Sequence, residues 1–238
     1  MSKTLSDETL DLPLFPLDTV LFPGMALPLH IFEERYLWMV NECLEGNRQF
    51  GVVMTTPTAD GEGTTPQEGL RSTYAHRVGT SALITQVQRH DDGRMDIVTA
   101  GVERFRVLDW LRTEPYIVGR IEPFPLEDTR SPELVRLAKA ASSLFVKYLR
   151  LAGEVLGTVI RVESAPRDAS TLAYMMAIAL QVSNDEKQQL LSISSLPTLL
   201  WKEASIMSRE QILLQRMSEV QDDNRGYVRG VMSYLSLN

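Results

Sequence analysis

The spacing of apolar residues changes near Pro125, and this change constrains the fold more than any other feature of the sequence. Before it, short apolar runs are separated by Pro, Gly and Asp, a pattern typical of β-strands and turns. After it, apolar residues recur every three or four positions, which is the period of an amphipathic helix. We therefore predict an α+β protein, with a β-rich domain over residues 12–125 and an α-helical domain over residues 126–238.

The β-rich part contains the signals of one helix and one tight hairpin. Apolar residues at helical spacing over residues 33–44, followed by Gly46, predict the helix. Asp92-Gly93 supplies the positive φ angle that a tight hairpin turn requires. The predicted strands are 50–54, 79–89, 94–100, 103–108 and 116–121, and the predicted loop is the Thr-, Pro- and Gly-rich stretch 55–72.

The helical part carries several helix-start signals. They are Ser131 before Pro132, Asp168, the capping-box pair Ser183 and Glu186, and Pro197. In the last predicted helix, Glu203 falls on the same side as the apolar residues Leu200 and Met207. These signals predict four helices.

The distribution of charge excludes one large class of partner. The chain has 24 Lys and Arg against 31 Asp and Glu, and the residues up to Leu126 carry 11 basic and 18 acidic side chains. Nucleic-acid binding usually needs a surplus of basic residues to displace counterions from phosphates. We therefore predict no nucleic-acid partner.

Neither a signal peptide nor a membrane span is recognisable in the sequence. Residues 1–12 are acidic and lack an apolar core, and the most apolar window, 172–182, is far shorter than the roughly 20 residues that cross a bilayer. The single cysteine, Cys43, fits a reducing compartment. We predict a cytoplasmic protein without membrane contact.

The motifs of common enzymes are absent from the sequence. It has no G-x-x-x-x-G-K-[ST] phosphate loop and no G-x-S-x-G nucleophile elbow. His30, His76 and His90 show no metal-ligand spacing, and Cys43 lies on the apolar side of its predicted helix. We predict a non-enzymatic protein without catalytic residues, metal site or cofactor.

The segment from residue 14 to residue 36 has several residues whose physical roles can be proposed. Pro23-Gly24 predicts a tight turn between short strands. Glu33 suits the first turn of the helix, Arg35 is expected to pair with a carboxylate or cap carbonyl groups, and Phe32 is expected to pack under the helix. Most of this segment therefore specifies the fold.

The same segment carries a resemblance to a known family. Its sequence is LFPLDTVLFPGM followed by LPLHIFEERY. It closely resembles the opening of the Lon protease N-terminal (substrate-binding) domain, with P-L-x-x-x-V-L-F-P-G and then P-L-x-I-F-E-x-R-Y. Further matches are Phe50-Gly51-Val52-Val53, Val78-Gly79-Thr80, Asp92-Gly93-Arg94 and the stretch from Gly101 to Val107, so the resemblance covers residues 12–124.

The resemblance implies a fold and limits the activity. It implies a β-rich, PUA-like pseudo-barrel followed by a helical bundle. Full-length Lon proteases add ATPase and peptidase modules, and neither a phosphate loop nor room for a peptidase exists here. The chain therefore looks like the stand-alone bacterial form that lacks both modules, and neither ATPase nor proteolytic activity is expected.

The resemblance also implies a function, namely a protein-binding module that recognises polypeptide clients. A groove bordered by residues 55–72, apolar anchors and a free sheet edge would suit an extended chain. The candidate binding residues are Phe22, Met25, Tyr74 and His76.

Two other classes of function stay open. In the first, the helical part binds one specific partner or self-associates, using Met175, Met176, Met207 and Met217 as an adaptable surface; the simpler interpretation is that they fill a helical core. In the second, the chain is a hydrolase or a small-molecule binder, which would require a deep pocket with convergent titratable groups. The oligomeric state is left open by the sequence.

Overall fold

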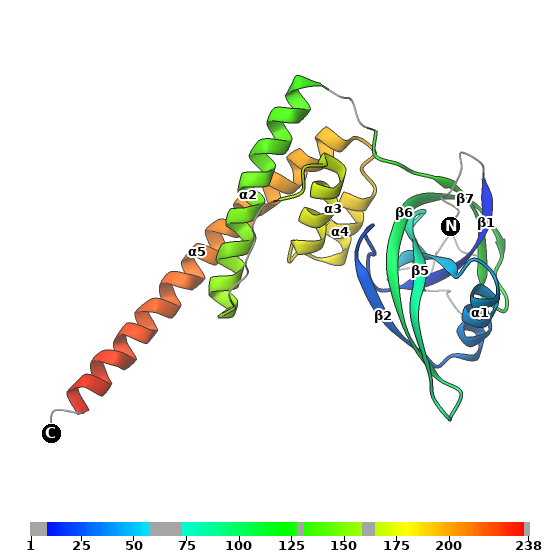
Figure 1. Cartoon of the computed structure of the whole chain (residues 1–238), viewed down its shortest axis with the longest axis horizontal. Helices are drawn as coiled ribbons and strands as arrows, with labels where there is room; N and C mark the ends of the chain where they lie inside the picture. The colour runs from blue at the N-terminus through cyan, green and yellow to red at the C-terminus, as the bar shows by residue number, and fades with distance from the viewer. Residues whose placement is uncertain (1–8, 58–72, 128–130, 159–164, 236–238) are drawn as a thin grey trace. The chain divides into compact units, whose positions relative to one another are not determined.

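The computed structural model describes residues 9–57, 73–127, 131–158 and 165–235. The chain divides into two compact units, Met1–Glu127 with Gln181–Ser194 and Asp128–Leu180 with Ser195–Asn238, which we call the β unit and the helical unit (Figure 1). The strands are β1 (Leu10–Leu17), β2 (Ala26–Ile31), β3 (Gln49–Pro57), β4 (Thr73–Ala75), β5 (Val78–Arg89), β6 (Met95–Arg112) and β7 (Ile117–Pro123). The helices are α1 (Glu34–Glu45), α2 (Pro132–Leu156), α3 (Ala169–Ala179), α4 (Asn184–Leu191) and α5 (Leu196–Leu235).

The strands of the β unit form a closed ring of pairings. From β1 the antiparallel pairing runs through β7, β6 and β5 to β3, and β3 pairs back to β1 in parallel. Closure pairs the central part of each ring strand on both sides, whereas the end of β5 at residues 86–89 pairs with β6 alone among the described strands. Among the described strands, β2 pairs with β6 alone and β4 with β3 alone, so each keeps one edge unpaired (Figure 1).

Strand β6 corrects one sequence-based prediction. The ranges 94–100 and 103–108 were expected to be two strands, whereas β6 is continuous from Met95 to Arg112. Its first part pairs with β2 and its second part with β7. Gly101 does not interrupt the strand; a Cβ there would lie 2.2 Å from the carbonyl oxygen of Phe22, so glycine permits a close approach of two backbones.

The predicted loop over 55–72 is also corrected at its start, because β3 continues to Pro57 and pairs with β4. Most of that predicted loop lies outside the described residues. The hairpin prediction is confirmed, since Gly93 has φ +88° between β5 and β6. The turn at Pro23-Gly24 is confirmed as well, because Gly24 has φ +82° and the Met25 amide donates to the Phe22 carbonyl at 3.0 Å.

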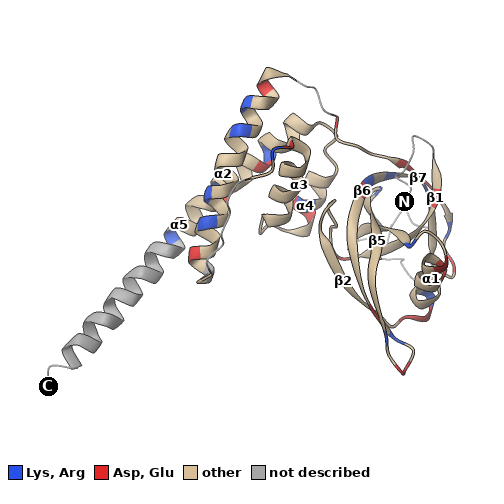
Figure 2. Cartoon of the chain, in the orientation of Figure 1, with Lys and Arg blue, Asp and Glu red and all other residues tan. Residues whose placement is uncertain are grey.

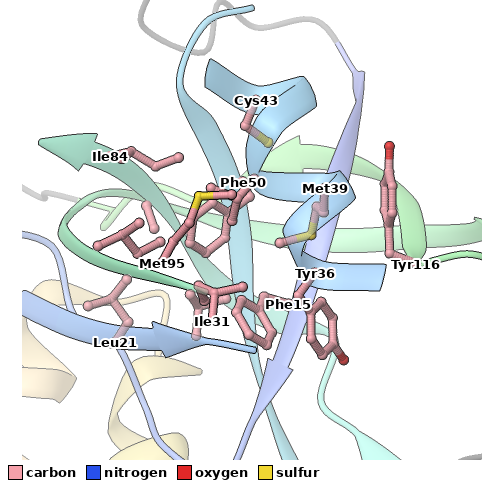
Figure 3. Packing of buried hydrophobic residues seen from close by; sticks show 14 residues of the cluster. Phe15, Leu21, Ile31, Tyr36, Met39, Cys43, Phe50, Ile84, Met95 and Tyr116 are labelled. Atoms are coloured by element: carbon pink, nitrogen blue, oxygen red, sulfur yellow. The ribbon is translucent and has the colours of Figure 1, made fainter. Parts of the chain in front are cut away.

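The main core of the β unit lies between the sheet and α1 (Figure 3). The rings of Phe15 and Tyr36 stack with centroids 4.1 Å apart, and Phe50 lies beside them. Cys43 is buried in this core, as the sequence predicts. Burial raises the pKa of its thiol to about 12, with the charge of Glu42 adding to the effect, so the reactive thiolate is not formed at neutral pH.

A smaller core cluster explains two of the glycines in the family motifs. The ring of Phe105 in β6 occupies the space where Gly51 and Gly79 would carry a Cβ. A Cβ at Gly51 would lie 2.6 Å from Phe105 Cζ and 2.6 Å from Leu14 Cδ2. The glycines therefore make room for this aromatic side chain.

We expect Gly51→Ala to lower the free energy of unfolding by about 2 kcal/mol, because the added methyl overpacks the Phe105 ring and the Leu14 side chain. Urea denaturation followed by far-UV circular dichroism measures the change. Gly46→Ala is the control, since its Cβ would meet no atom nearer than 3.5 Å. Equal stability of the two variants would contradict this account of the glycine.

Helix α4 belongs to the β unit, although the sequence-based division placed it in the domain over residues 126–238. Its N-cap Ser183 accepts a hydrogen bond from the Glu186 amide at 3.2 Å, as the capping pattern predicts. The side-chain amide of Gln188 donates a hydrogen bond to the backbone carbonyl of Val78 at 3.0 Å. Arg104 of β6 donates to the carbonyls of Leu191 and Ile193, so side-chain hydrogen bonds hold this segment on the β unit.

The helical unit is formed by α2, α3 and α5. The predicted caps are present: Ser131 Oγ accepts from the Leu134 amide at 3.1 Å, and an Asp168 carboxyl oxygen accepts from the Thr171 amide at 2.7 Å. The Gln211 side chain of α5 donates to a backbone carbonyl of α2 at 3.0 Å. None of the helices in the described part of the chain has an apolar stretch of membrane-spanning length.

Candidate functional site

The motif segment of the β unit surrounds a surface groove of about 300 Å³. We call it the signature groove. It is lined by the ends of β1 and β2, the turn into α1, the first turn of that helix, and one residue of β3. Its lining residues are Phe15, Pro16, Leu17, Asp18, Leu29, His30, Ile31, Phe32, Glu33, Arg35, Tyr36 and Thr55.

The lining of the groove contains both buried and exposed apolar side chains. Phe15, Ile31 and Tyr36 are buried and belong to the main core, so they are held rigidly by packing. Phe32 is 63% exposed, which corrects the expectation that it packs under the helix. Its ring lies 6.0 Å from that of His30, centroid to centroid. An exposed phenylalanine beside a preformed apolar surface is suited to binding an apolar ligand group.

The polar groups around the groove pair with one another. Two nitrogens of the Arg35 guanidinium donate to one carboxyl oxygen of Glu33, at 2.7 and 3.0 Å, so the expected carboxylate pairing of Arg35 is confirmed. The same guanidinium lies 4.6 Å from the ring centroid of Tyr36. Burial raises the pKa of Tyr36, Arg35 opposes this shift and Glu33 adds to it. The phenol therefore stays protonated at neutral pH.

The edge of β2 adjoins the groove. Leu29, His30 and Ile31 belong to this strand and also line the groove, and β2 pairs with β6 alone among the described strands. Pro28, which lacks a backbone donor, sits in this strand, as is common for a strand at a sheet edge. An extended polypeptide can pair with such an edge and place a side chain in an adjoining pocket.

Of the four predicted binding residues, Phe22, Met25 and His76 are not among the residues that line the groove. Phe22 is 1% exposed and Met25 is half-buried against the main core, so Phe22 has no surface available for a client. Tyr74 pairs with Thr56 through its backbone, and its side chain lies outside the described residues. His76 is half-buried, and burial lowers its pKa while Asp185 opposes the shift.

The sequence reasoning missed Phe32 and the groove, although both lie in the motif segment. Only two residues, Phe32 and Glu33, separate the end of β2 from the start of α1. A turn that short can leave an apolar side chain on the surface, so its length could have indicated that Phe32 is exposed.

A second cluster brings together residues that are distant in the sequence. His30, His90 and Asp96 meet on the β unit, with one ligand atom from each lying within 4.8 Å of the others. Their side chains are between 33% and 48% exposed, so this is a surface cluster and differs from the deep pocket that a hydrolase would require. Of the described residues, these three could hold a metal ion.

Residues 11–209, which include the residues that line the groove and, apart from Leu10, the β unit's described strands, match a family model of the ATP-dependent protease La (Lon) substrate-binding domain. The chain therefore belongs to the family of Lon substrate-binding domains.

Curated relatives include Lon proteases of several bacteria. The protein of Dictyoglomus thermophilum is 26% identical over 214 residues, which are 89% of this chain and 26% of that protein. The protein of Roseiflexus castenholzii is 28% identical over 222 residues, which are 91% of this chain and 27% of that protein. The chain thus spans about a quarter of the length of these relatives.

Solved structures of Lon N-terminal domains also match. The Lon N-terminal domain protein of Xanthomonas campestris has a TM-score of 0.56 and 26% identity, with 81% of this chain and 96% of that chain covered. The N-terminal domain of the Mycobacterium avium complex Lon protease has a TM-score of 0.58 and 20% identity, with 83% and 98% covered. At 20% identity, the match with the Mycobacterium avium complex domain shows a similarity of fold alone.

Proposed function

We propose that this protein is a non-enzymatic module that binds extended or unfolded polypeptide segments in the signature groove. The observation that carries the proposal is the exposed ring of Phe32 beside a rigid apolar surface and beside the edge of β2 with which no described strand pairs. Membership of the Lon substrate-binding domain family supports the same function. We extend the proposal to the architecture: the closed ring of strands corresponds to a PUA-like pseudo-barrel, and α2, α3 and α5 form a helical bundle.

In this proposal the client supplies an apolar side chain and a stretch of extended backbone. The side chain contacts Phe32 and the exposed parts of the groove, which gives affinity without selecting a particular sequence. The backbone pairs with the free edge of β2. Figure 2 shows both basic and acidic residues on the β unit.

We expect Phe32→Ala to weaken binding of an unfolded polypeptide at least about fivefold, because truncating a central aromatic contact usually costs about 1 kcal/mol or more. Fluorescence anisotropy with a labelled, reduced and alkylated protein as the client measures the affinity. Trp38→Ala is the matched control, since Trp38 is 53% exposed on α1 and does not line the groove.

Two results would contradict the proposal. The first is that the unaltered protein binds no unfolded client, and the second is that Phe32→Ala and Trp38→Ala bind alike. Met25→Ala and His76→Ala, tested in the same assay, decide whether the binding residues proposed from the sequence contribute. A loss of affinity confined to those two variants would move the site away from the groove.

A single specific partner is the second candidate function, favoured by exposed apolar side chains of the helical unit. Trp201, Ile212 and Leu213 of α5 are each more than half exposed. The methionines favour it less, since Met176 and Met207 are fully buried and only Met175, among those described, is well exposed. Mild crosslinking in cell lysate separates the two functions: one stoichiometric protein indicates a partner, and many unrelated proteins indicate polypeptide recognition.

A further inference from the structure

The pairing of the strands places the side chains of His30 and His90 beside the carboxylate of Asp96. His30 in β2 lies directly opposite Asp96 in β6, and Asp96 lies opposite Gln88 in β5 on its other side. His90 follows β5 by one residue, at the start of the hairpin turn, where its amide donates to the Arg94 carbonyl at 2.9 Å. The three side chains therefore belong to adjacent positions of a rigid hairpin and its neighbouring strand.

Asp96 lies between the two imidazole rings. His30 Nδ1 is 2.6 Å from Asp96 Oδ1, and His90 Nε2 is 2.7 Å from Asp96 Oδ2. The ring centroids of the histidines are 6.2 Å apart. His30 and Asp96 also line an open cavity of about 460 Å³ with Gln86 and Gln88, so solvent and ions reach them. The pKa of Asp96 is lowered, first by the hydrogen bond with His30 and then by that with His90.

This donor set matches the coordination chemistry of zinc. Zn²⁺ binds imidazole nitrogen and carboxylate oxygen at about 2.0–2.2 Å, which places the ligand atoms of a tetrahedral site about 3.3 Å apart. The three ligand atoms here lie within 4.8 Å of one another and belong to partly exposed side chains, which can adjust by rotation. Two imidazoles with one carboxylate are a common ligand set for first-row transition metals, whereas Ca²⁺ and Mg²⁺ prefer oxygen ligands.

The surrounding charges favour a cation. The tip of the hairpin carries Asp91 and Asp92, and the acidic colour at this tip is visible in Figure 2. The Arg94 side chain donates a hydrogen bond of 2.6 Å to Asp92, so its direct partner is Asp92, although its charge also interacts with Asp96. Without a metal, exposed His–Asp pairs contribute little to stability.

We propose that His30, His90 and Asp96 form a zinc(II) site, with three protein ligands and a fourth position open to water. Such a three-ligand surface site binds more weakly than a closed four-ligand structural site. The proposal does not depend on polypeptide binding. Its test measures metal uptake alone, so it succeeds or fails separately from the proposed function.

The test titrates the metal-free full chain with zinc against a chromophoric chelator. We expect one equivalent bound with a dissociation constant on the order of 1 μM or tighter. Asp96→Asn, His30→Gln and His90→Gln are each expected to weaken binding at least about tenfold, since each removes or weakens one of the ligands. His76→Gln is the matched control, because it removes the third histidine of the chain and leaves the cluster intact.

Thermal unfolding gives a second readout. A ligand that binds only the folded state stabilises it. Zinc is therefore expected to raise the melting temperatures of the unaltered protein and of His76→Gln, and not to change the melting temperatures of the three cluster variants. Cobalt(II) should give the visible absorption of a four-coordinate site. The absence of stoichiometric zinc uptake overturns the proposal, and so does uptake that the cluster variants retain.

Discussion

Replacing Arg104 by methionine is expected to lower the free energy of unfolding of the β unit by about 4 kcal/mol. Arg104 is 2% exposed, and its Nη1 donates to the Leu191 carbonyl at 2.7 Å and to the Ile193 carbonyl at 2.6 Å. Its guanidinium also lies 4.8 Å from the ring centroid of Phe124. Methionine fills much of the volume but donates no hydrogen bond, so two carbonyls lose their charged donor at about 1–3 kcal/mol each.

The measurement is urea denaturation combined with hydrogen exchange. In Arg104→Met, amide protection should fall first in α4 and the residues after it, because the lost hydrogen bonds hold that segment on the sheet. Arg106→Met is the matched control. Arg106 is exposed in the same strand, pairs with Glu122 at 3.4 Å and is expected to cost less than about 1 kcal/mol.

Arg104→Lys separates charge from geometry. Lysine keeps the positive charge but lacks the planar fork that reaches both carbonyls, so we expect an intermediate loss of stability. If Arg104→Met and Arg106→Met were equally stable, the assignment of Arg104 as the residue that holds α4 would be wrong.

The second large effect concerns Glu203 in α5, where we expect substitution by leucine to stabilise the helical unit by about 3 kcal/mol. Glu203 is fully buried, and neither of its carboxyl oxygens has a hydrogen-bond partner in the described part of the chain. A buried carboxyl without a partner is costly, and replacing buried charged groups by apolar ones of similar size often gains about 1–4 kcal/mol. Chemical denaturation of Glu203→Leu measures the gain.

The pH dependence of stability provides an independent check. Burial raises the pKa of Glu203 well above its ordinary value of 4.5. The folded state then binds more protons than the unfolded state above that pH, so this carboxyl makes stability fall as pH rises from about 4.5 through the folded-state pKa. Below about 4.5 the carboxyl is protonated in both states and this loss disappears.

Glu203→Gln removes the titration while keeping a polar side chain, so it should lose this pH-dependent fall and gain less stability than Glu203→Leu. Glu154→Gln, on the exposed surface of α2, is expected to keep the pH profile of the unaltered protein. A Glu203→Gln profile identical to that of Glu154→Gln would refute the assignment of the fall to Glu203.

Local structure was largely predictable from the sequence. The helix predicted over 33–44 is α1 at Glu34–Glu45, and the caps at Ser131, Asp168 and Ser183 are all present. Each of these signals acts over only a few residues, through a hydrogen bond to a nearby amide or through the φ angle of one glycine. Such signals can be recognised in the sequence because the interacting residues lie within the same short segment.

The candidate sites were predictable only in part. The sequence analysis interpreted the motif segment mainly as specifying the fold, and the exposure of Phe32 and the burial of Phe22 are visible only in the folded β unit. Arg104 alternates with apolar residues in a way typical of a surface position, yet it is buried because a segment almost 90 positions later supplies its acceptors. Glu203 lies in an apolar stripe that the sequence displays, and its lack of a hydrogen-bond partner is visible only in the packed helices.

The sequence alone was enough to place α1, the helix caps, the Asp92-Gly93 hairpin and the family resemblance, although it divided β6 into two strands and ended β3 too early. Only the tertiary structure decided that the strands close into a ring, that α4 joins the β unit, and that His30 and Asp96, 66 positions apart, meet at one point of the sheet. The physical reason is range: turns and caps are governed by neighbours along the chain, whereas strand register and burial are governed by neighbours in space.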